Sequence, residues 1–394
     1  MKTITTQVQQ TSKMSQIRDA LSQAFKEREE IVTGMVTALL AKEMLFLLGE
    51  PGTAKSAVCE ALCNSIGGNY FSWLLGKTTT PDELFGSVSI AALKQDRYER
   101  VTTNKLPEAT VAFVDEIFKG SSAILNTLLP VINERRFFNG SKPTKIPLQV
   151  LFGASNELPQ GEELAALYDR FVLKYVANPI QNDSNMSDLL LNGLNVRIPT
   201  ITIQELAIEQ EAASNIKLTV DVVNVVVTLR KAVRAEGIVV SDRKWIQSMR
   251  VVKACAYLNG HTQVELEDLE ILQHVLWTDP GQQKTVRGLI LKLTNPAGDE
   301  LLKIQDGIQE ALANFAKVKT DNSKNLASTD IVNREIASKR ISEEASSTLA
   351  KLKTAAQLLK KLSDKNPGQN KIESSIAELK QKQTALIEAE LGWA

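Results

Sequence analysis

The chain has 394 residues, a length that predicts about two to three domains because one hydrophobic core rarely grows beyond roughly 250 to 300 residues. Hydrophobic residues make up 43 % and charged residues 23 %, which excludes collagen-like, disordered and disulfide-scaffold proteins. Lys plus Arg equals Asp plus Glu at 46 each, so the overall charge provides no attraction for nucleic acid or anionic lipid. The longest apolar stretch, 35–48, contains Lys42 and Glu43 and is shorter than the roughly 20 residues of a membrane span. The polar N-terminus lacks the apolar segment of a secretory signal, so we expect a cytoplasmic protein.

The first half of the chain alternates between helical and strand patterns. Residues 15–42 carry apolar side chains at spacings near three to six, which predicts a helical segment. Five short apolar runs follow and are predicted to be strands: 44–48, 70–75, 111–114, 149–152 and 172–176. Uninterrupted apolar strands separated by helix-sized segments indicate an α/β domain with a mostly parallel sheet that is buried on both faces.

The second half of the chain is predicted to be helical. After about residue 200 we expect four helices that end near Trp277 and form a small all-α domain. Further on, 336–362 and 372–386 carry narrow apolar stripes on either side of Pro367 and Gly368, which predicts an antiparallel helical hairpin. This hairpin is either a structural brace or a docking arm for a partner, and the pattern does not choose between them.

A phosphate-binding loop is predicted directly after the first strand. The eight residues are Gly49, Glu50, Pro51, Gly52, Thr53, Ala54, Lys55 and Ser56, which match GxxxxGK[ST] except that Ala54 replaces the last glycine. The glycines let the backbone curl so that N–H groups and the positive end of the next helix face phosphate oxygens. Lys55 would reach the β- and γ-phosphates, and the Ser56 hydroxyl would bind Mg²⁺. The Ala54 methyl group would crowd the loop if this position needs a positive φ.

A pair of acids follows the strand predicted at 111–114. Asp115 stands where a phosphate-loop protein needs a second partner for Mg²⁺, and Glu116 is then positioned to orient the attacking water. A carboxylate pair after a strand is by itself common as a helix N-cap. In combination with the phosphate loop, it predicts a site that binds and hydrolyses ATP with Mg²⁺.

Several motifs in order give the chain a family resemblance. GEPGTAKS, VAFVDEIFKG, ILNTLLPVINERRFFNG, FGASNELP and ALYDRF resemble the MoxR group of AAA+ ATPases, in which an alanine at the position of Ala54 is familiar. The later VSDRKW resembles the RavA-like branch of that group. The resemblance covers roughly 15–280. It implies a large αβα nucleotide-binding domain over 1–195 and a small all-α lid over 196–280. The helical pattern, and not the resemblance, predicts a coiled-coil-like extension over 281–394.

The resemblance also implies roles for individual side chains. Asn156 resembles sensor 1, which holds the attacking water, although an Asn here could also cap a turn. Arg170 resembles the arginine finger delivered to a neighbouring subunit, and Arg135 and Arg136 are a second candidate pair unless they are solvated helix-end charges. Arg243 resembles sensor 2, which reaches the γ-phosphate when the lid closes.

Two segments of the large domain correspond to hairpins that line the central opening of a ring. These are 86–107 and 137–143, so Tyr98, Phe137 and Phe138 are candidate substrate contacts. The alternative is that these aromatic side chains pack within their own hairpins.

The function predicted by this resemblance is ATP-driven remodelling of protein complexes. We expect a chaperone-like homo-oligomer that forms a hexameric ring. It is expected to work with a partner that carries a von Willebrand factor A domain. One alternative is an AAA+ motor that acts on nucleic acid, which the balanced charge disfavours. Another is a nucleotide switch or small-molecule kinase, although the sequence indicates no pocket for an acceptor substrate.

Overall fold

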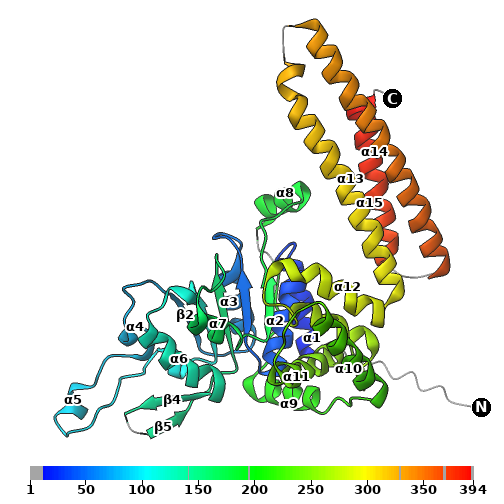
Figure 1. The fold of residues 1–394 in the computed structure, drawn as a ribbon. Helices are drawn as coiled ribbons and strands as arrows, with labels where there is room; N and C mark the ends of the chain where they lie inside the picture. Colours follow the sequence, from blue (N-terminus) through cyan, green and yellow to red (C-terminus); the bar gives the residue numbers. More distant parts are fainter. Residues whose placement is uncertain (1–11, 141, 194–195, 328–329, 367–369, 392–394) are drawn as a thin grey trace, which may run out of the picture. The chain divides into compact units, whose positions relative to one another are not determined.

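The computed structural model describes residues 12–140, 142–193, 196–327, 330–366 and 370–391 (Figure 1). The chain divides into two compact units, the second of which begins at Gly288. Within the described residues, no helix is both long and apolar enough to cross a membrane. The turn predicted at Pro367 and Gly368 lies outside the described residues.

The first unit is built on a parallel five-stranded sheet. Its strands are β1 (Leu45–Leu48), β2 (Tyr70–Leu74), β3 (Val111–Asp115), β6 (Val150–Ser155) and β7 (Leu173–Val176), in the order β2-β3-β6-β1-β7. All five predicted strands are therefore confirmed. Because the strands are parallel and β6 lies between β3 and β1, the segments that follow these three strands emerge at the same edge of the sheet.

Helices cover both faces of this sheet (Figure 1). One face contacts α2 (Glu29–Ala41) and α3 (Lys55–Ser65), and α1 (Lys13–Ala24) packs on these two helices. Alternate strand residues such as Phe46 and Val114 face the other side, where they pack with α6 (Ser122–Glu134) and α7 (Glu162–Tyr168); both belong to one buried cluster. Burial on both faces explains why the strands are uninterrupted apolar runs.

The single helical segment predicted over 15–42 is wrong in one respect. The structure has two helices, α1 and α2, which are separated by 25–28. Glu27 in this break has φ +58°, a left-handed conformation that ends a regular helix. The apolar spacing continues across the break, and for this reason the pattern did not reveal it.

The segment predicted to be the lid, 196–280, which is called the lid below, is helical, as predicted. It contains α9 (Ile203–Ser214), α10 (Val220–Ala235) and α11 (Asp242–Leu258), and the fourth predicted helix is a run of 3₁₀ turns, η3 (Leu266–His274). Helix α9 begins at a capping box in which the Thr202 side chain accepts from the Glu205 N–H and the Glu205 carboxylate accepts from the Thr202 N–H. Helices α9 and α11 both pack on α2, so the lid rests on the same side of the sheet as the helices before and after β1.

A buried lysine ties β7 to the end of the lid. Lys174 is 0 % exposed, and its Nζ donates to the Trp277 carbonyl oxygen at 2.7 Å. The same Nζ lies 4.2 Å from the centre of the Tyr168 ring. Burial, with the nearby positive charge of Lys244, lowers the pKa of Lys174 to about 6.

The low pKa of Lys174 in the folded state predicts that the stability of the protein depends on pH. In the unfolded chain its pKa is about 10.4, so between about pH 6 and pH 10 the unfolded state binds one proton more than the folded state. The free energy of unfolding therefore rises with pH, by up to about 1.4 kcal/mol per pH unit from this group. We expect Lys174→Met to remove that slope, which urea unfolding of both proteins at pH 7 and pH 8 will measure. Equal slopes in the two proteins would contradict the assignment.

The described residues of the second unit form three long helices. They are α13 (Pro296–Leu326), α14 (Ile331–Lys365) and α15 (Asn370–Leu386), which share one apolar core. The predicted hairpin is present as α14 and α15, and α13 packs along α14 (Figure 1). Leu301, Ile308 and Phe315 of α13 recur every seven residues and enter this core, a heptad spacing that the sequence analysis overlooked. A short helix, α12 (Gln283–Thr294), precedes α13 in the chain.

Candidate functional site

The phosphate loop connects β1 to α3, where it was predicted. Gly49 lies so close to the segment that follows β7 that a β-carbon at Gly49 would come within 2.3 Å of the Ala177 carbonyl oxygen. Ala54 has φ +62°, the positive φ that the sequence analysis named as the condition for crowding. The loop is thus tightly curled, and the first N–H groups of α3, which have no acceptor within the helix, lie at its end. This arrangement fits the phosphates of a nucleotide.

Lys55 is the charged group of this loop. Its Nζ donates to the carbonyl oxygens of Gly49 at 2.7 Å and Glu50 at 2.8 Å. Burial lowers the pKa of Lys55, whereas the negative charges of Asp115 and Glu116 raise it. The lysine therefore lies within the field of both acids, and its ammonium is held at the loop by backbone oxygens that a phosphate could replace as partners.

The two acids lie at the carboxyl end of β3. Asp115 is the last residue of the strand, and Glu116 follows in a left-handed conformation with φ +51°. Glu116 Oε2 accepts from Ser155 Oγ at 3.4 Å and lies 3.3 Å from Lys119 Nζ. Asn156 is exposed and directly follows β6. The sheet order thus brings Asp115, Glu116 and Asn156 to the same edge as the phosphate loop.

Oxygen ligands for a metal ion are also present at this edge. Ser56 is exposed in the first turn of α3, and Asp115 is half-buried on the adjoining side of the site. A hydroxyl and a carboxylate, with phosphate oxygens, are the ligands that Mg²⁺ prefers in phosphate-loop proteins. The residues present therefore fit a nucleotide with Mg²⁺.

Arg28 supports the phosphate loop through hydrogen bonds to the backbone. The sequence did not indicate this role. It is buried; its Nε donates to the Thr53 carbonyl oxygen at 3.3 Å and one terminal nitrogen donates to the Asn178 carbonyl oxygen at 2.5 Å. It thus links the break between α1 and α2 to the phosphate loop and to the segment after β7. An Arg between two helices has no local signature, because its partners lie far away in the sequence.

Two predicted arginines lie near each other at the opposite side of the sheet, where the amino ends of the strands are. Arg170 lies just before β7, where its side chain donates to Asn133 Oδ1 at 2.9 Å. Arg243, in the first turn of α11, pairs with Asp169 at 3.1 Å. Burial lowers the pKa of Arg170, and the nearby positive charge of Arg243 lowers it further. Both arginines therefore lie near the amino ends of the strands, whereas the phosphate loop follows the carboxyl end of β1.

A basic cavity of about 450 Å³ contains both of these arginines. Its charged lining residues are Lys42, Glu43, Glu134, Arg135, Lys145, Arg170, Arg243 and Arg250. Six of these eight side chains are basic, so the cavity favours an anion.

The two predicted hairpins are joined to each other. Strands β4 (Arg136–Asn139) and β5 (Lys142–Lys145) form the second hairpin, and the first is closed by a bridge between Val88 and Arg100 around the short helix α5 (Ile90–Leu93). Asn139 accepts from the Arg100 N–H at 2.6 Å and donates to the Arg100 carbonyl oxygen at 3.2 Å.

The aromatic candidates in these hairpins differ in exposure. Tyr98 is 53 % exposed and Phe138 is 52 % exposed. Phe137 is 3 % exposed and stacks on Phe85 with ring centres 5.5 Å apart. Of the two alternatives, packing therefore holds for Phe137, although its ring packs in the core on Phe85 and not within its own hairpin.

Comparisons with known proteins agree with this geometry. The sequence model of the family described as the MoxR domain in the MoxR-vWA-beta-propeller ternary systems matches residues 12–217, more than half of the chain. The chain belongs to the MoxR family of AAA+ ATPases. A model of an AAA lid domain matches residues 221–290, a range that contains α11 and η3 and nearly all of α10.

Relatives of this MoxR-family chain are found in archaea and bacteria. Uncharacterized protein MJ0079 of Methanocaldococcus jannaschii is 42 % identical over 292 residues, which cover 74 % of this chain and 77 % of that protein. Chaperone MoxR1 of Mycobacterium tuberculosis is 26 % identical over 37 % of this chain and 39 % of that protein. A crystal structure of a candidate ATPase from Cytophaga hutchinsonii has the same fold, with a TM-score of 0.58 and 16 % identity over 71 % of this chain and 93 % of that one.

Arg135 and Arg136 have different surroundings in this MoxR-family fold. Arg135 lies at the end of α6, and its guanidinium donates to the carbonyl oxygens of Ile132, Lys42 and, at 3.5 Å, Gln149. Burial lowers the pKa of Arg135 to about 10, against the raising effect of the Glu43 charge. Arg136 is exposed and lies 3.8 Å from Glu134. Arg135 thus joins the end of α6 to the segments before β1 and β6.

We therefore expect Arg135→Met to destabilise the fold by about 1 to 3 kcal/mol, because the carbonyl oxygens of Ile132, Lys42 and Gln149 lose a charged donor that joins three segments. Urea unfolding will measure the loss. Arg136→Met is the matched control, and as a surface substitution it should change the free energy of unfolding by no more than about 0.5 kcal/mol. Equal stabilities of the two variants would show that Arg135 is not a structural arginine.

Proposed function

We propose that this chain hydrolyses ATP with Mg²⁺ in a closed ring, in which each nucleotide lies between two subunits. One observation carries the proposal: the phosphate loop lies at the carboxyl edge of the sheet, whereas Arg170 lies at the amino edge. An arginine so placed completes a nucleotide site only when it belongs to a neighbouring copy. On this proposal 1–195 bind the nucleotide, 196–280 are the lid and 281–394 are an extension.

Each residue at the carboxyl edge has a role in this proposal. The loop N–H groups and Lys55 hold the phosphates, and Ser56 and Asp115 hold the metal ion, which offsets negative charge on the phosphates. Glu116 accepts a proton from the attacking water, and Asn156 orients that water. Before this step Glu116 must exchange its contacts with Ser155 and Lys119 for one with the water.

Arg243 takes a role different from the one that the resemblance implied. Its guanidinium lies beside Asp169 in the same cavity as Arg170, and not beside the phosphate loop of its own subunit. We assign Arg243 to the neighbouring subunit's nucleotide, together with Arg170. The two positive charges would then stabilise the negative charge that develops on the transferred phosphoryl group.

The substrate on which this ring acts is proposed to be a protein. The joined hairpins expose Tyr98 and Phe138, and MoxR1, to which part of the chain is similar, is named a chaperone. The name of the matching family model supports a partner with a von Willebrand factor A domain. Three finer points stay predictions: that the ring has six subunits, that the chain belongs to the RavA-like branch, as VSDRKW indicates, and that the protein is cytoplasmic.

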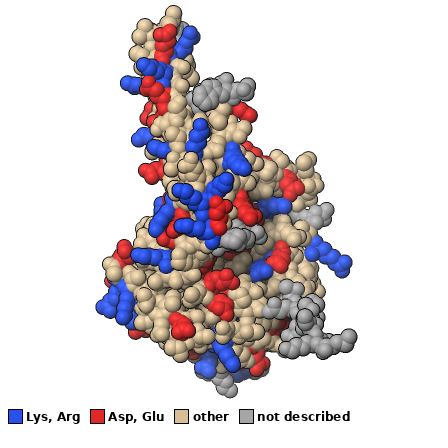
Figure 2. All heavy atoms as spheres, turned by 90° about the vertical axis from the view of Figure 1, so that its right-hand side faces the viewer, with Lys and Arg blue, Asp and Glu red and all other residues tan. Residues whose placement is uncertain are grey.

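The nucleic-acid motor has no support of this kind. Lys and Arg balance Asp and Glu over the chain, and Figure 2 shows the two kinds of charge interspersed on the face that it displays. A nucleic-acid motor would favour a basic stripe along its binding surface. DNA-stimulated ATP hydrolysis that weakens with salt would reverse this conclusion.

The experiment that tests the proposal measures size and ATPase rate together. We expect the chain to form larger assemblies with ATP and Mg²⁺, and the rate per subunit to rise with protein concentration because the arginines act between subunits. Light scattering gives the size, and phosphate release gives the rate. A monomer with a concentration-independent rate would overturn the ring and favour a nucleotide switch.

A further inference from the structure

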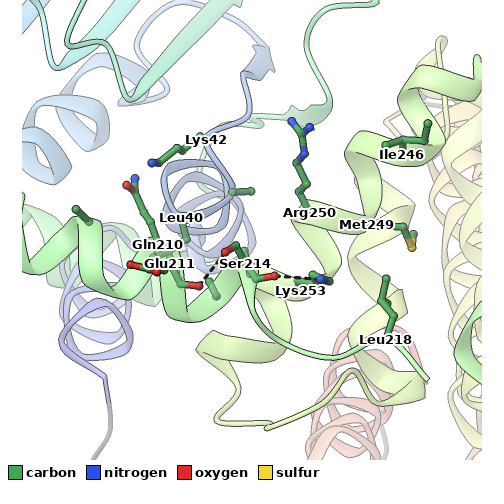
Figure 3. Close-up of a pocket in the computed structure, with 14 residues that line it drawn as sticks. Leu40, Lys42, Gln210, Glu211, Ser214, Leu218, Ile246, Met249, Arg250 and Lys253 are labelled. Atoms are coloured by element: carbon green, nitrogen blue, oxygen red, sulfur yellow. Dashed lines mark hydrogen bonds between the residues drawn. The ribbon is translucent and has the colours of Figure 1, made fainter.

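The lid carries a hydrophobic groove of about 740 Å³ between the end of α2, α9 and α11 (Figure 3). Its larger apolar lining residues are Leu40, Leu218, Ile246 and Met249. Basic side chains are present as well: Lys42 and Arg250 lie at one end of the groove, and Lys253 donates to the Ser214 carbonyl oxygen at 3.0 Å. Ile246 is 67 % exposed, so the groove presents apolar surface to its surroundings.

This groove is continuous with the basic cavity described above. Lys42 and Arg250 line both, and the cavity also contains Arg170 and Arg243. The lid groove and the two arginines therefore belong to one face of the first unit, at the amino ends of the strands.

Helix α8 (Asp183–Asn192) has the complementary surface. No residue of this helix is buried, and Leu190 is 78 % exposed. Met186, Leu189 and Leu190 follow the i, i+3, i+4 spacing that places apolar side chains on one helix face. Such a face is what a helix uses when it binds in a hydrophobic groove.

Helix α8 is held on the nucleotide side of the fold. It follows the carboxyl end of β7, and the Glu27 carboxylate accepts from the N–H groups of Gln181 at 2.8 Å and Asn182 at 3.0 Å just before the helix. Arg28, which directly follows Glu27 in the sequence, contacts the phosphate loop through the Thr53 carbonyl oxygen. In Figure 1, α8 lies at the top of the first unit and α9 at its lower edge.

The geometry points to a contact between copies of this chain in which the apolar face of α8 occupies the lid groove of the next subunit. The inference rests on the proposed ring: when Arg170 of one copy faces the phosphate loop of another, the groove and α8 also face each other. Charge favours the contact, since Asp183 lies in the first turn of α8 and the groove is lined by three basic side chains, Lys42, Arg250 and Lys253, against one acid, Glu211. The contact is head-to-tail, as a closed ring requires.

Cross-linking between two single-cysteine variants tests this contact directly. Cys59, Cys63 and Cys255 are buried, so a short thiol-reactive cross-linker will report the introduced residues. Leu190→Cys mixed with Ile246→Cys, with ATP and Mg²⁺ present, should give covalent dimers and no longer ladder. Either variant alone should give none. Leu190→Cys mixed with Val227→Cys, an exposed lid position that does not line the groove, is the matched control and should also give none.

Charge substitutions provide a second measurement. We expect Leu190→Glu and Met249→Glu each to raise the protein concentration for half-maximal ATPase by about tenfold or more, whereas Val227→Glu changes it by less than about twofold. Leu190 is exposed, so a failure to fold does not explain its effect.

The outcomes separate this inference from the proposed ring. Assemblies with a concentration-dependent rate, but with no cross-linked dimers and no effect of either Glu variant, would overturn the α8 contact and leave the ring intact. That result is also the one expected if another protein fills the groove. A monomer with a concentration-independent rate would overturn the ring and the α8 contact together.

Discussion

Glu116→Gln should lower the rate of ATP hydrolysis by about 10²- to 10⁴-fold, the usual contribution of a general base. The glutamate lies at the carboxyl end of β3 beside the phosphate loop, and an amide of the same shape cannot accept the proton of the attacking water. Lys55, Ser56 and Asp115 are unchanged in the variant. Nucleotide binding should therefore survive, and the variant should hold ATP without turnover.

The measurement combines phosphate release with the affinity for a fluorescent ATP analogue. Glu60→Gln is a suitable control, because Glu60 is an exposed residue of α3 that lies outside the site. It should retain the wild-type rate and affinity. If Glu116→Gln lost affinity and rate in equal proportion, Glu116 would be a binding residue and the base would have to be sought elsewhere.

The parts of the site that the sequence predicts are those in which the information is local. The phosphate loop is eight consecutive residues, and Asp115 and Glu116 directly follow an apolar run. Parallel strands then place these segments at one edge, so the strand pattern alone predicted that they would meet. Even the strain at Ala54 could be anticipated, because its position in the motif is one that glycine usually holds.

Contacts between distant segments could not be predicted in this way. The partners of Glu116 show this: Lys119 is three residues away, but Ser155 comes from another strand. Arg28 likewise contacts Thr53 and Asn178 across the fold. Such contacts depend on the order of the strands and on side-chain directions, neither of which has a period in the sequence.

Neighbouring residues also differ for reasons that lie outside their own segment. Phe137 and Phe138 point to opposite sides of β4, as alternation in a strand requires. Phe137 is the buried one because its side of β4 faces the core cluster, where its ring stacks on Phe85. Similarly, Lys244 and Arg243 both pair with Asp169, at 2.8 Å and 3.1 Å, and this shared partner from a distant segment holds Arg243 near Arg170.

Arg170→Ala is expected to lower ATP turnover by about 10³- to 10⁵-fold in the assembled state, which is the effect of a lost arginine finger. Arg170 does not approach the phosphate loop of its own subunit, so the variant should bind ATP normally. Arg230→Ala is the control: Arg230 is an exposed arginine of α10 that pairs with Asp242 at 2.7 Å and does not line the basic cavity. It should keep the wild-type rate.

Mixing two inactive variants decides whether Arg170 acts between subunits. Glu116→Gln subunits keep Arg170 but have an inactive nucleotide site, whereas Arg170→Ala subunits keep an intact nucleotide site but lack Arg170. In a mixed ring, some intact sites face a neighbour that supplies the arginine, so the mixture should regain activity that neither variant has alone. An arginine that acted within its own subunit would give no recovery at any ratio. Because each recovered site needs one subunit of each kind in the right order, activity should be highest near equal amounts and fall as either variant predominates.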